Sequence, residues 1–192
     1  MNKFIIALVL IGLGFFYVLV LNSPRPSQKT KEAVNPPSKI RTSISPGPSA
    51  IKNLPTKAII KTVKGDITLR LFPKDAPGTV ANFAEKAKSG FYDNLIFHRV
   101  ENWVIQGGDP NGNGTGGGPM PTELNNKPFV IGSLGVARGG DINISNNAQF
   151  FITKTDASWL NGKYTNFGIV TSGMDVVNKI KVGDKILGIS VN

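Results

Sequence analysis

The stretch from Phe97 to Gly118, FHRVENWVIQGGDPNGNGTGGG, holds the greatest concentration of functional side chains in this chain. Its twenty-two residues include the only histidine, an arginine, a tryptophan, a glutamine and seven glycines. The apolar residues near its start alternate with polar ones, as in a β-strand. We therefore expect the fold to organise the rest of the chain around this stretch.

The residues before this stretch predict a β-hairpin and a helix. Alternating apolar residues over Ala58–Val63 and Ile67–Leu71, separated by Lys64-Gly65, are typical of two strands joined by a tight turn. Apolar residues at helical spacing follow Pro77, and Gly90 stands where that helix would end.

Further short runs predict six more strands and a second helix at Met174–Ile180. The strands are expected at Leu95–Val100, Val104–Gln106, Phe129–Val136, Gln149–Thr153, Phe167–Thr171 and Lys185–Val191. Many short strands with few helices indicate a mainly β domain over residues 56–192, either a closed barrel or a sandwich.

Composition restricts both the size of the core and the chemistry. With 192 residues, 40% of them apolar, the chain can form one ordinary domain and some non-globular sequence. It contains no cysteine, which excludes disulfides, thiolate metal sites and cysteine nucleophiles. The net charge is +10, but residues 56–192 carry fifteen basic against eleven acidic side chains, scattered along the sequence. We therefore expect no nucleic-acid partner.

An apolar run near the amino end predicts a membrane anchor. Phe4–Leu21 contains eighteen residues without a charge and follows Lys3. A helix of that length reaches roughly 27 Å, close to the ~30 Å hydrocarbon core of a bilayer. We favour an uncleaved transmembrane signal-anchor helix over residues 1–21. A cleaved signal peptide and a buried core helix are the alternatives.

The orientation of this anchor is argued from both of its flanks. The flank after it is more basic than Lys3, and the positive-inside rule would place the following residues in the cytoplasm. Single amino-terminal spans before a globular domain nevertheless commonly act as signal-anchors. We expect a single-pass protein of the cell membrane with an extracytoplasmic domain. Residues 22–55, with seven prolines and six serines, predict a flexible linker that precedes the domain.

Two generic motifs in the opening stretch lack the sequence context that they require. The G-x-G-x-x-G pattern that begins at Gly112 matches a dinucleotide fingerprint, but Pro119 and Pro121 follow where a helix must begin. The D-x-N-x-N-G pattern that begins at Asp109 resembles a calcium loop, but its twelfth position is Met120. We therefore expect neither a cofactor nor a metal ion.

The lone histidine, His98, is next to Arg99 in an expected strand, so the two side chains should point to opposite faces. No nucleophile elbow appears in the sequence. We therefore interpret His98 as a hydrogen-bonded structural residue rather than a general base.

Seven segments occur in a characteristic order along the chain. They are FHRV (97–100), QGGDP (106–110), GTGG (114–117), AR (137–138), NAQFFI (147–152), WLNGKY (159–164) and FG (167–168). Together, from about Ala58 to Val191, they resemble the signature of cyclophilin-type peptidyl-prolyl cis-trans isomerases, here in a membrane-anchored, prokaryotic-like form. The resemblance implies a closed eight-stranded antiparallel β-barrel capped by two α-helices.

The resemblance also implies the residues of the active site. The catalytic residues are Arg99 and Gln106, and the substrate-binding residues are Trp103, Val104, Ala137, Gln149, Phe151, Trp159, Leu160 and Tyr164. The chain departs from the usual family pattern at five places. Only six residues separate Arg99 from Gln106, one fewer than is usual, which predicts a tighter turn at Glu101-Asn102. The other four departures are Trp103 for phenylalanine, Val104 for methionine, Arg138 for asparagine and Tyr164 for histidine.

The implied function is rotation of X-Pro bonds in proline-containing polypeptides, which would assist protein folding near the membrane. We expect Arg99 to donate to the prolyl nitrogen as the amide twists, and Gln106 to hold the guanidinium or the substrate carbonyl. The protein is expected to act as a monomer. The alternative is a scaffold that binds proline peptides with slow or no turnover, because the shortened turn misplaces Trp103.

Overall fold

A computed structural model describes residues 53–192 of the chain. The transmembrane helix expected over residues 1–21 lies outside the described residues, as does almost all of the linker expected over 22–55. From residue 53 onward, no helix is both long enough and apolar enough to span a membrane.

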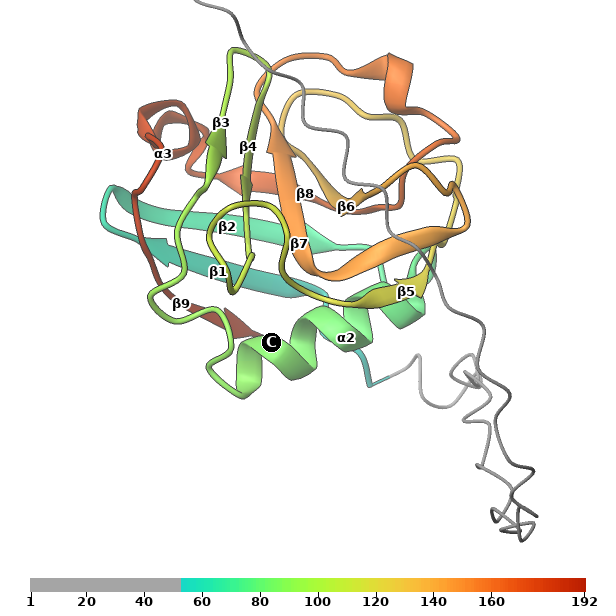
Figure 1. Cartoon of the computed structure of the whole chain (residues 1–192), viewed down its shortest axis with the longest axis horizontal. Coiled ribbons are helices and arrows are strands. Elements are labelled where there is room, and N and C mark those ends of the chain that lie inside the picture. The colour runs from blue at the N-terminus through green and yellow to red at the C-terminus, as the bar shows by residue number, and fades with distance from the viewer. Residues whose placement is uncertain (1–52) are drawn as a thin grey trace, which may run out of the picture. The chain divides into compact units, whose positions relative to one another are not determined.

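The described residues form one curled antiparallel sheet, two α-helices and a short 3-10 helix (Figure 1). The strands are β1 (Lys57–Thr62), β2 (Gly65–Leu71), β3 (Arg99–Val100), β4 (Val104–Gly107), β5 (Pro119–Pro121), β6 (Ser133–Arg138), β7 (Ile144–Thr153), β8 (Asn166–Ser172) and β9 (Ile186–Val191). Eight of them pair in the order β3-β4-β7-β6-β8-β2-β1-β9, and β5 pairs with β7 outside that path. A mainly β fold with a curled antiparallel sheet and two helices is therefore confirmed.

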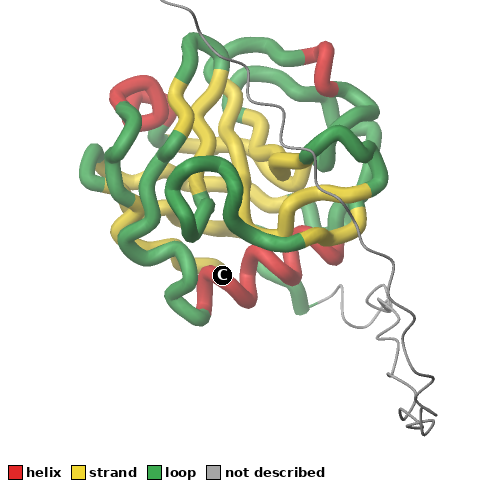
Figure 2. Tube along the Cα trace, in the orientation of Figure 1, coloured by secondary structure: helices red, strands yellow, loops and turns green. Residues whose placement is uncertain are grey.

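The two ends of this strand path come together through backbone hydrogen bonds. Ile96, just before β3, forms a bridge with Lys185, just before β9. The Phe97 N–H donates to the Asp184 carbonyl at 2.9 Å, and the Ile186 N–H donates to the carbonyl of Leu95 at 2.8 Å. These bonds satisfy backbone groups that a free sheet edge would expose. Figure 2 shows the strands curving around one interior, with the loops at its rim.

The β1–β2 hairpin follows from the alternation seen in the sequence. Thr62 pairs with Gly65, so the turn residues are Val63 and Lys64, one position earlier than expected. Gly65 has a φ of +126°, which a residue with a side chain rarely adopts, and it is therefore suited to the exit of this turn. Apolar residues of both strands point inward, and Ile60 and Ile67 are fully buried.

Helix α2 (Pro77–Lys88) closes one side of the sheet and agrees with the expected helix. Pro77 begins it, as its fixed φ and missing N–H allow. Ala76 provides no side-chain cap. Instead the distant Glu123 carboxylate accepts from the N–H groups of Gly78 at 2.8 Å and Thr79 at 2.7 Å, which satisfies donors that the first turn leaves free. Helix α3 (Met174–Lys179) is one residue shorter than expected.

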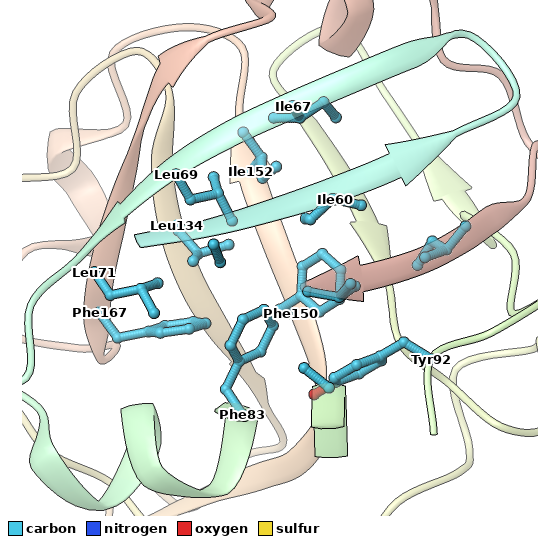
Figure 3. Close-up of a cluster of buried hydrophobic side chains, with 14 of the residues drawn as sticks. Ile60, Ile67, Leu69, Leu71, Phe83, Tyr92, Leu134, Phe150, Ile152 and Phe167 are labelled. Atoms are coloured by element: carbon cyan, nitrogen blue, oxygen red, sulfur yellow. The ribbon is translucent and has the colours of Figure 1, made fainter. Parts of the chain in front are cut away.

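The main core lies between α2 and the inner face of the sheet (Figure 3). Phe83 of α2 packs edge-on against Phe150 of β7 at a centroid distance of 5.8 Å. It packs in the same way against Phe167 of β8 at 5.4 Å. Aliphatic residues from the β1–β2 hairpin complete this cluster, which is separate from a smaller one near the cavity described below.

Several boundaries differ from those expected. β3 contains only Arg99–Val100, β6 begins at Ser133 rather than Phe129, and β7 begins at Ile144 rather than Gln149. β5 and the 3-10 helix η1 (Ser158–Leu160) were not expected. The first part of β7 and all of β5 have no apolar alternation, because their side chains are largely exposed or half-buried. Periodicity therefore could not detect them.

Candidate active site

A cavity of about 400 Å³ opens beside the β3–β4 hairpin. Seven of the ten expected site residues line it: Arg99, Trp103, Gln106, Ala137, Phe151, Leu160 and Tyr164. Four residues that were not expected also line it: His98, Asn113, Gly114 and Arg138. The fold therefore brings together side chains from β3, β4, β6, β7 and the loops that follow them.

Arg99 and Gln106 are direct partners across the β3–β4 pair. Their side chains consequently lie on the same face of the sheet, where cross-strand neighbours interact. Arg99 Nη1 donates to Gln106 Oε1 at 3.2 Å. The Gln106 amide then donates to Gln149 Oε1 at 2.8 Å. Gln106 thus holds one edge of the guanidinium, and Gln149 in turn holds the Gln106 amide.

The six-residue spacing between Arg99 and Gln106 produces a two-residue turn at Asn102-Trp103, rather than one at Glu101-Asn102. Glu101 faces Val104 across the turn, and its N–H donates to the Val104 carbonyl at 2.9 Å. The Glu101 carboxylate accepts from Arg99 Nε at 2.6 Å and from Trp103 Nε1 at 2.8 Å. The hydrogen bond from Arg99 is the main cause that holds the pKa of Glu101 below its usual value.

The floor of the cavity is an apolar cluster separate from the main core. Phe151 stacks on Phe129 at a centroid distance of 5.8 Å and meets the edge of Tyr164 at the same distance. Leu160 and the fully buried Val104 complete the support of this floor. A flat, rigid aromatic surface of this kind suits a small apolar ring.

Three expected site residues do not line the cavity. Val104 lies beneath its floor and is fully buried. Gln149 is also buried, and its amide donates to the carbonyls of Gly114 at 3.0 Å and Gly116 at 2.8 Å. Trp159 is 52% exposed and packs edge-on against Trp103 outside the cavity. These positions support the residues that line the cavity.

The opposite rim is formed by Tyr164, Ala137 and Arg138. The Arg138 guanidinium lies 4.5 Å from the centre of the Tyr164 ring, a cation–π arrangement. Its nitrogens also donate to the carbonyls of Lys163 at 2.7 Å and Gly139 at 2.8 Å. Arg138 is therefore held at the rim and adds a second positive charge there.

Within the described part of the chain, His98 lacks the hydrogen bonds that the sequence interpretation expected for it. It lines the cavity, and neither of its ring nitrogens has a hydrogen-bond partner among residues 53–192. Burial lowers its pKa, with a raising influence from Asp109 and a further lowering one from Arg99. The expected alternation failed here because β3 begins only at Arg99, so His98 lies in irregular backbone. The only feature of the sequence that could have indicated that His98 lines the cavity was its position next to Arg99.

Comparison with known proteins identifies the family of this domain. Residues 57–187 match the model of the family described as cyclophilin type peptidyl-prolyl cis-trans isomerase/CLD. A peptidyl-prolyl cis-trans isomerase of Synechococcus elongatus is 41% identical over 141 residues, which cover 71% of this chain and 96% of that protein. One from Helicobacter pylori is 46% identical over 136 residues, covering 67% and 83%.

Other relatives are much longer. The chain spans 22% of peptidyl-prolyl cis-trans isomerase 9 of Schizosaccharomyces pombe, with 42% identity over 138 residues. Among solved structures, a Cryptosporidium parvum cyclophilin type isomerase in the presence of the dipeptide Ala-Pro gives a TM-score of 0.66 at 30% identity. The match covers 71% of this chain and 98% of that one. The chain therefore belongs to the family of cyclophilin-type peptidyl-prolyl cis-trans isomerases.

Proposed function

We propose that the domain accelerates rotation about X-Pro bonds in polypeptides, with the prolyl ring on the Phe151 floor and Arg99 as the catalytic donor. The barrier to this rotation is ~18–20 kcal/mol, because resonance gives the C–N bond partial double-bond character. In the twisted amide that resonance is lost, and the prolyl nitrogen gains a lone pair. A donor that faces this nitrogen stabilises the twisted state more than the planar one.

The observation that carries the proposal is that Arg99 lines a cavity that the Phe151 ring also lines. Nε and Nη1 are engaged by Glu101 and Gln106, whereas Nη2 makes no hydrogen bond to residues 53–192. A guanidinium keeps its charge at physiological pH, so Nη2 remains a charged donor at the cavity wall. The Arg99 side chain is 43% exposed, so its contact with the prolyl nitrogen is strengthened only as the bound peptide displaces water from the cavity.

The position of Trp103 argues against the alternative function, a scaffold that binds proline peptides with slow or no turnover. That alternative assumed that the shortened turn displaces Trp103 from the site. The ring instead lines the cavity, and its indole N–H is held by Glu101. Turnover is therefore the function that we propose, with Gln106 orienting Arg99 and the remaining wall residues binding the peptide.

A direct test measures cis–trans interconversion of an Ala-Pro-containing peptide by NMR exchange, using the full chain. Arg99→Ala is expected to lower kcat/KM by about 10²–10³-fold, as loss of a donor to developing charge does in other enzymes. Arg70→Ala is the matched control, because Arg70 is exposed on β2 and does not line the cavity. Equal kcat/KM values for the wild type and Arg99→Ala would refute the assigned role.

The cellular setting of this activity is part of the proposal. The uncharged run Phe4–Leu21 supports a single membrane anchor. We further propose that the domain lies outside the cytoplasm and acts as a monomer on unfolded proteins near the membrane. Protease treatment of intact spheroplasts tests the orientation, because an extracytoplasmic domain is digested and a cytoplasmic one is protected. Light scattering of the purified chain tests the monomer.

A further inference from the structure

Glu101 joins two residues of the cavity wall through one carboxylate. Oε1 accepts from Arg99 Nε at 2.6 Å, and Oε2 accepts from Trp103 Nε1 at 2.8 Å. An exposed ion pair by itself contributes little, because side-chain entropy and water oppose it. The Glu101 contacts differ from an ordinary surface pair, because both partners line the same cavity and each uses a separate oxygen.

The backbone also holds Glu101 in this position. Its N–H donates to the Val104 carbonyl at 2.9 Å, and its carbonyl accepts from Lys154 Nζ at 3.0 Å. Glu101 and Arg99 are two residues apart on an extended segment, so their side chains lie on the same face. The two-residue turn therefore places the Glu101 carboxylate beside the Arg99 guanidinium.

We propose that Glu101 is a positioning residue of this isomerase, which orients the Arg99 guanidinium and the Trp103 indole with its two carboxylate oxygens. Two acceptors on different edges, Glu101 at Nε and Gln106 at Nη1, fix the plane of the Arg99 guanidinium. The Arg99 side chain is then held in one rotamer before the substrate binds, with Nη2 available to the cavity. This is the preorganisation that a catalytic donor requires. The inference rests on the function proposed above.

Glu101→Gln is the informative substitution because it keeps the size of the side chain. A glutamine has one acceptor oxygen and one donor nitrogen, so it can no longer accept from Arg99 and Trp103 through two separate oxygens. We expect kcat to fall by about tenfold, since small misplacements of a catalytic group are costly, while KM changes less than kcat. Glu85→Gln is the matched control, because it removes the same charge from an exposed site on α2.

A second measurement reports the proposed bridge without reference to activity. The chain contains two tryptophans, so ¹⁵N-labelled protein gives two indole N–H signals, and Trp103→Phe identifies the relevant one. Glu101→Gln is expected to shift the Trp103 indole signal much more than that of Trp159. Glu85→Gln is expected to move neither signal.

Each outcome decides between support and refutation. A reduced kcat together with a shifted Trp103 signal supports the proposal. An unchanged or increased kcat overturns it, and so does a reduced kcat with an unmoved Trp103 signal, because the carboxylate would then act only through its charge. An inactive wild type would instead refute the proposed function, and the indole shift would still report whether Glu101 bridges the two residues.

Discussion

Gly135 on β6 lies directly opposite Phe151 on β7, and the Phe151 ring covers it. A methyl group added at Gly135 would lie 2.7 Å from Cε1 and Cε2 of that ring and still closer to Cζ, whereas ordinary contacts begin at 3.4 Å. The ring would have to move by more than the difference of about 0.7 Å, because Cζ is closer than these two atoms. Phe129 blocks one face of Phe151 and Tyr164 meets its edge, so we expect the displacement to be toward the cavity.

Gly135→Ala should therefore damage the site more than it damages the fold. Overpacking of this kind costs about 1–3 kcal/mol. If most of this appears in substrate binding, kcat/KM falls by about 5–150-fold, because each 1.4 kcal/mol is a factor of ten. The melting temperature should fall by only a few degrees. NMR exchange on an Ala-Pro peptide and thermal unfolding of the full chain measure the two effects.

Gly140→Ala is the control for this experiment, because an added Cβ there meets no atom within 4 Å and its φ is not positive. It should leave both kcat/KM and the melting temperature unchanged. If Gly135→Ala also keeps wild-type values of both, the contact between Gly135 and Phe151 does not limit the site, and our reasoning about the floor is wrong.

Three further predictions concern titration and stability. The pKa of His98 should lie below its ordinary value of 6.5, mainly because burial disfavours the charged ring. The contribution of His98 to stability is therefore complete above pH 6.5 and is lost as the pH falls. An NMR titration of this single histidine with a midpoint at or above 6.5 would contradict this. Asp109→Asn should lower the free energy of unfolding by about 1–3 kcal/mol at pH 7, because the buried carboxylate accepts from several backbone N–H groups of the following loop. Although burial raises the pKa of Asp109, these hydrogen bonds hold that pKa below 3.8. The difference in free energy of unfolding between the wild type and Asp109→Asn, measured by urea titration, should therefore shrink as the pH falls through that lowered pKa. Ile152→Ala should cost about 2–5 kcal/mol in the same titrations, because Ile152 is fully buried, whereas a similar cost for the exposed Ile131→Ala would contradict the assignment of the core.

Local patterns were sufficient for the elements whose burial alternates regularly. The β1–β2 hairpin, α2 and α3 agree with the expected elements to within one or two residues. The same patterns failed where packing partners come from distant parts of the chain. Phe129 is buried, yet it lies in a loop rather than in the expected strand, because its backbone pairs with Asn161 and Ala157 of a distant loop instead of with a strand.

The residues of the site, like the secondary-structure elements, were predictable from the sequence only in part. Motif resemblance identified Arg99, Gln106 and Phe151 as neighbours of one cavity, which the fold confirms. It did not identify His98 or Arg138 as lining residues, since both depend on where a strand begins and how a loop closes. The bridging role of Glu101 had no signal in the motif, because it arises only when the turn places the carboxylate between Arg99 and Trp103.

The amino-acid sequence by itself thus determined the mainly β fold, the family and most of the residues around the cavity, because alternation, helical spacing and motif order are properties of the chain itself. The tertiary structure alone decided the orientation of Arg99 and the effect of the shortened turn. Cross-strand register sets Arg99 opposite Gln106 and Glu101 opposite Val104. In a hairpin the register is fixed by the turn, and the sequence placed this turn at Glu101-Asn102 instead of Asn102-Trp103, so it could not reveal which side chains would meet.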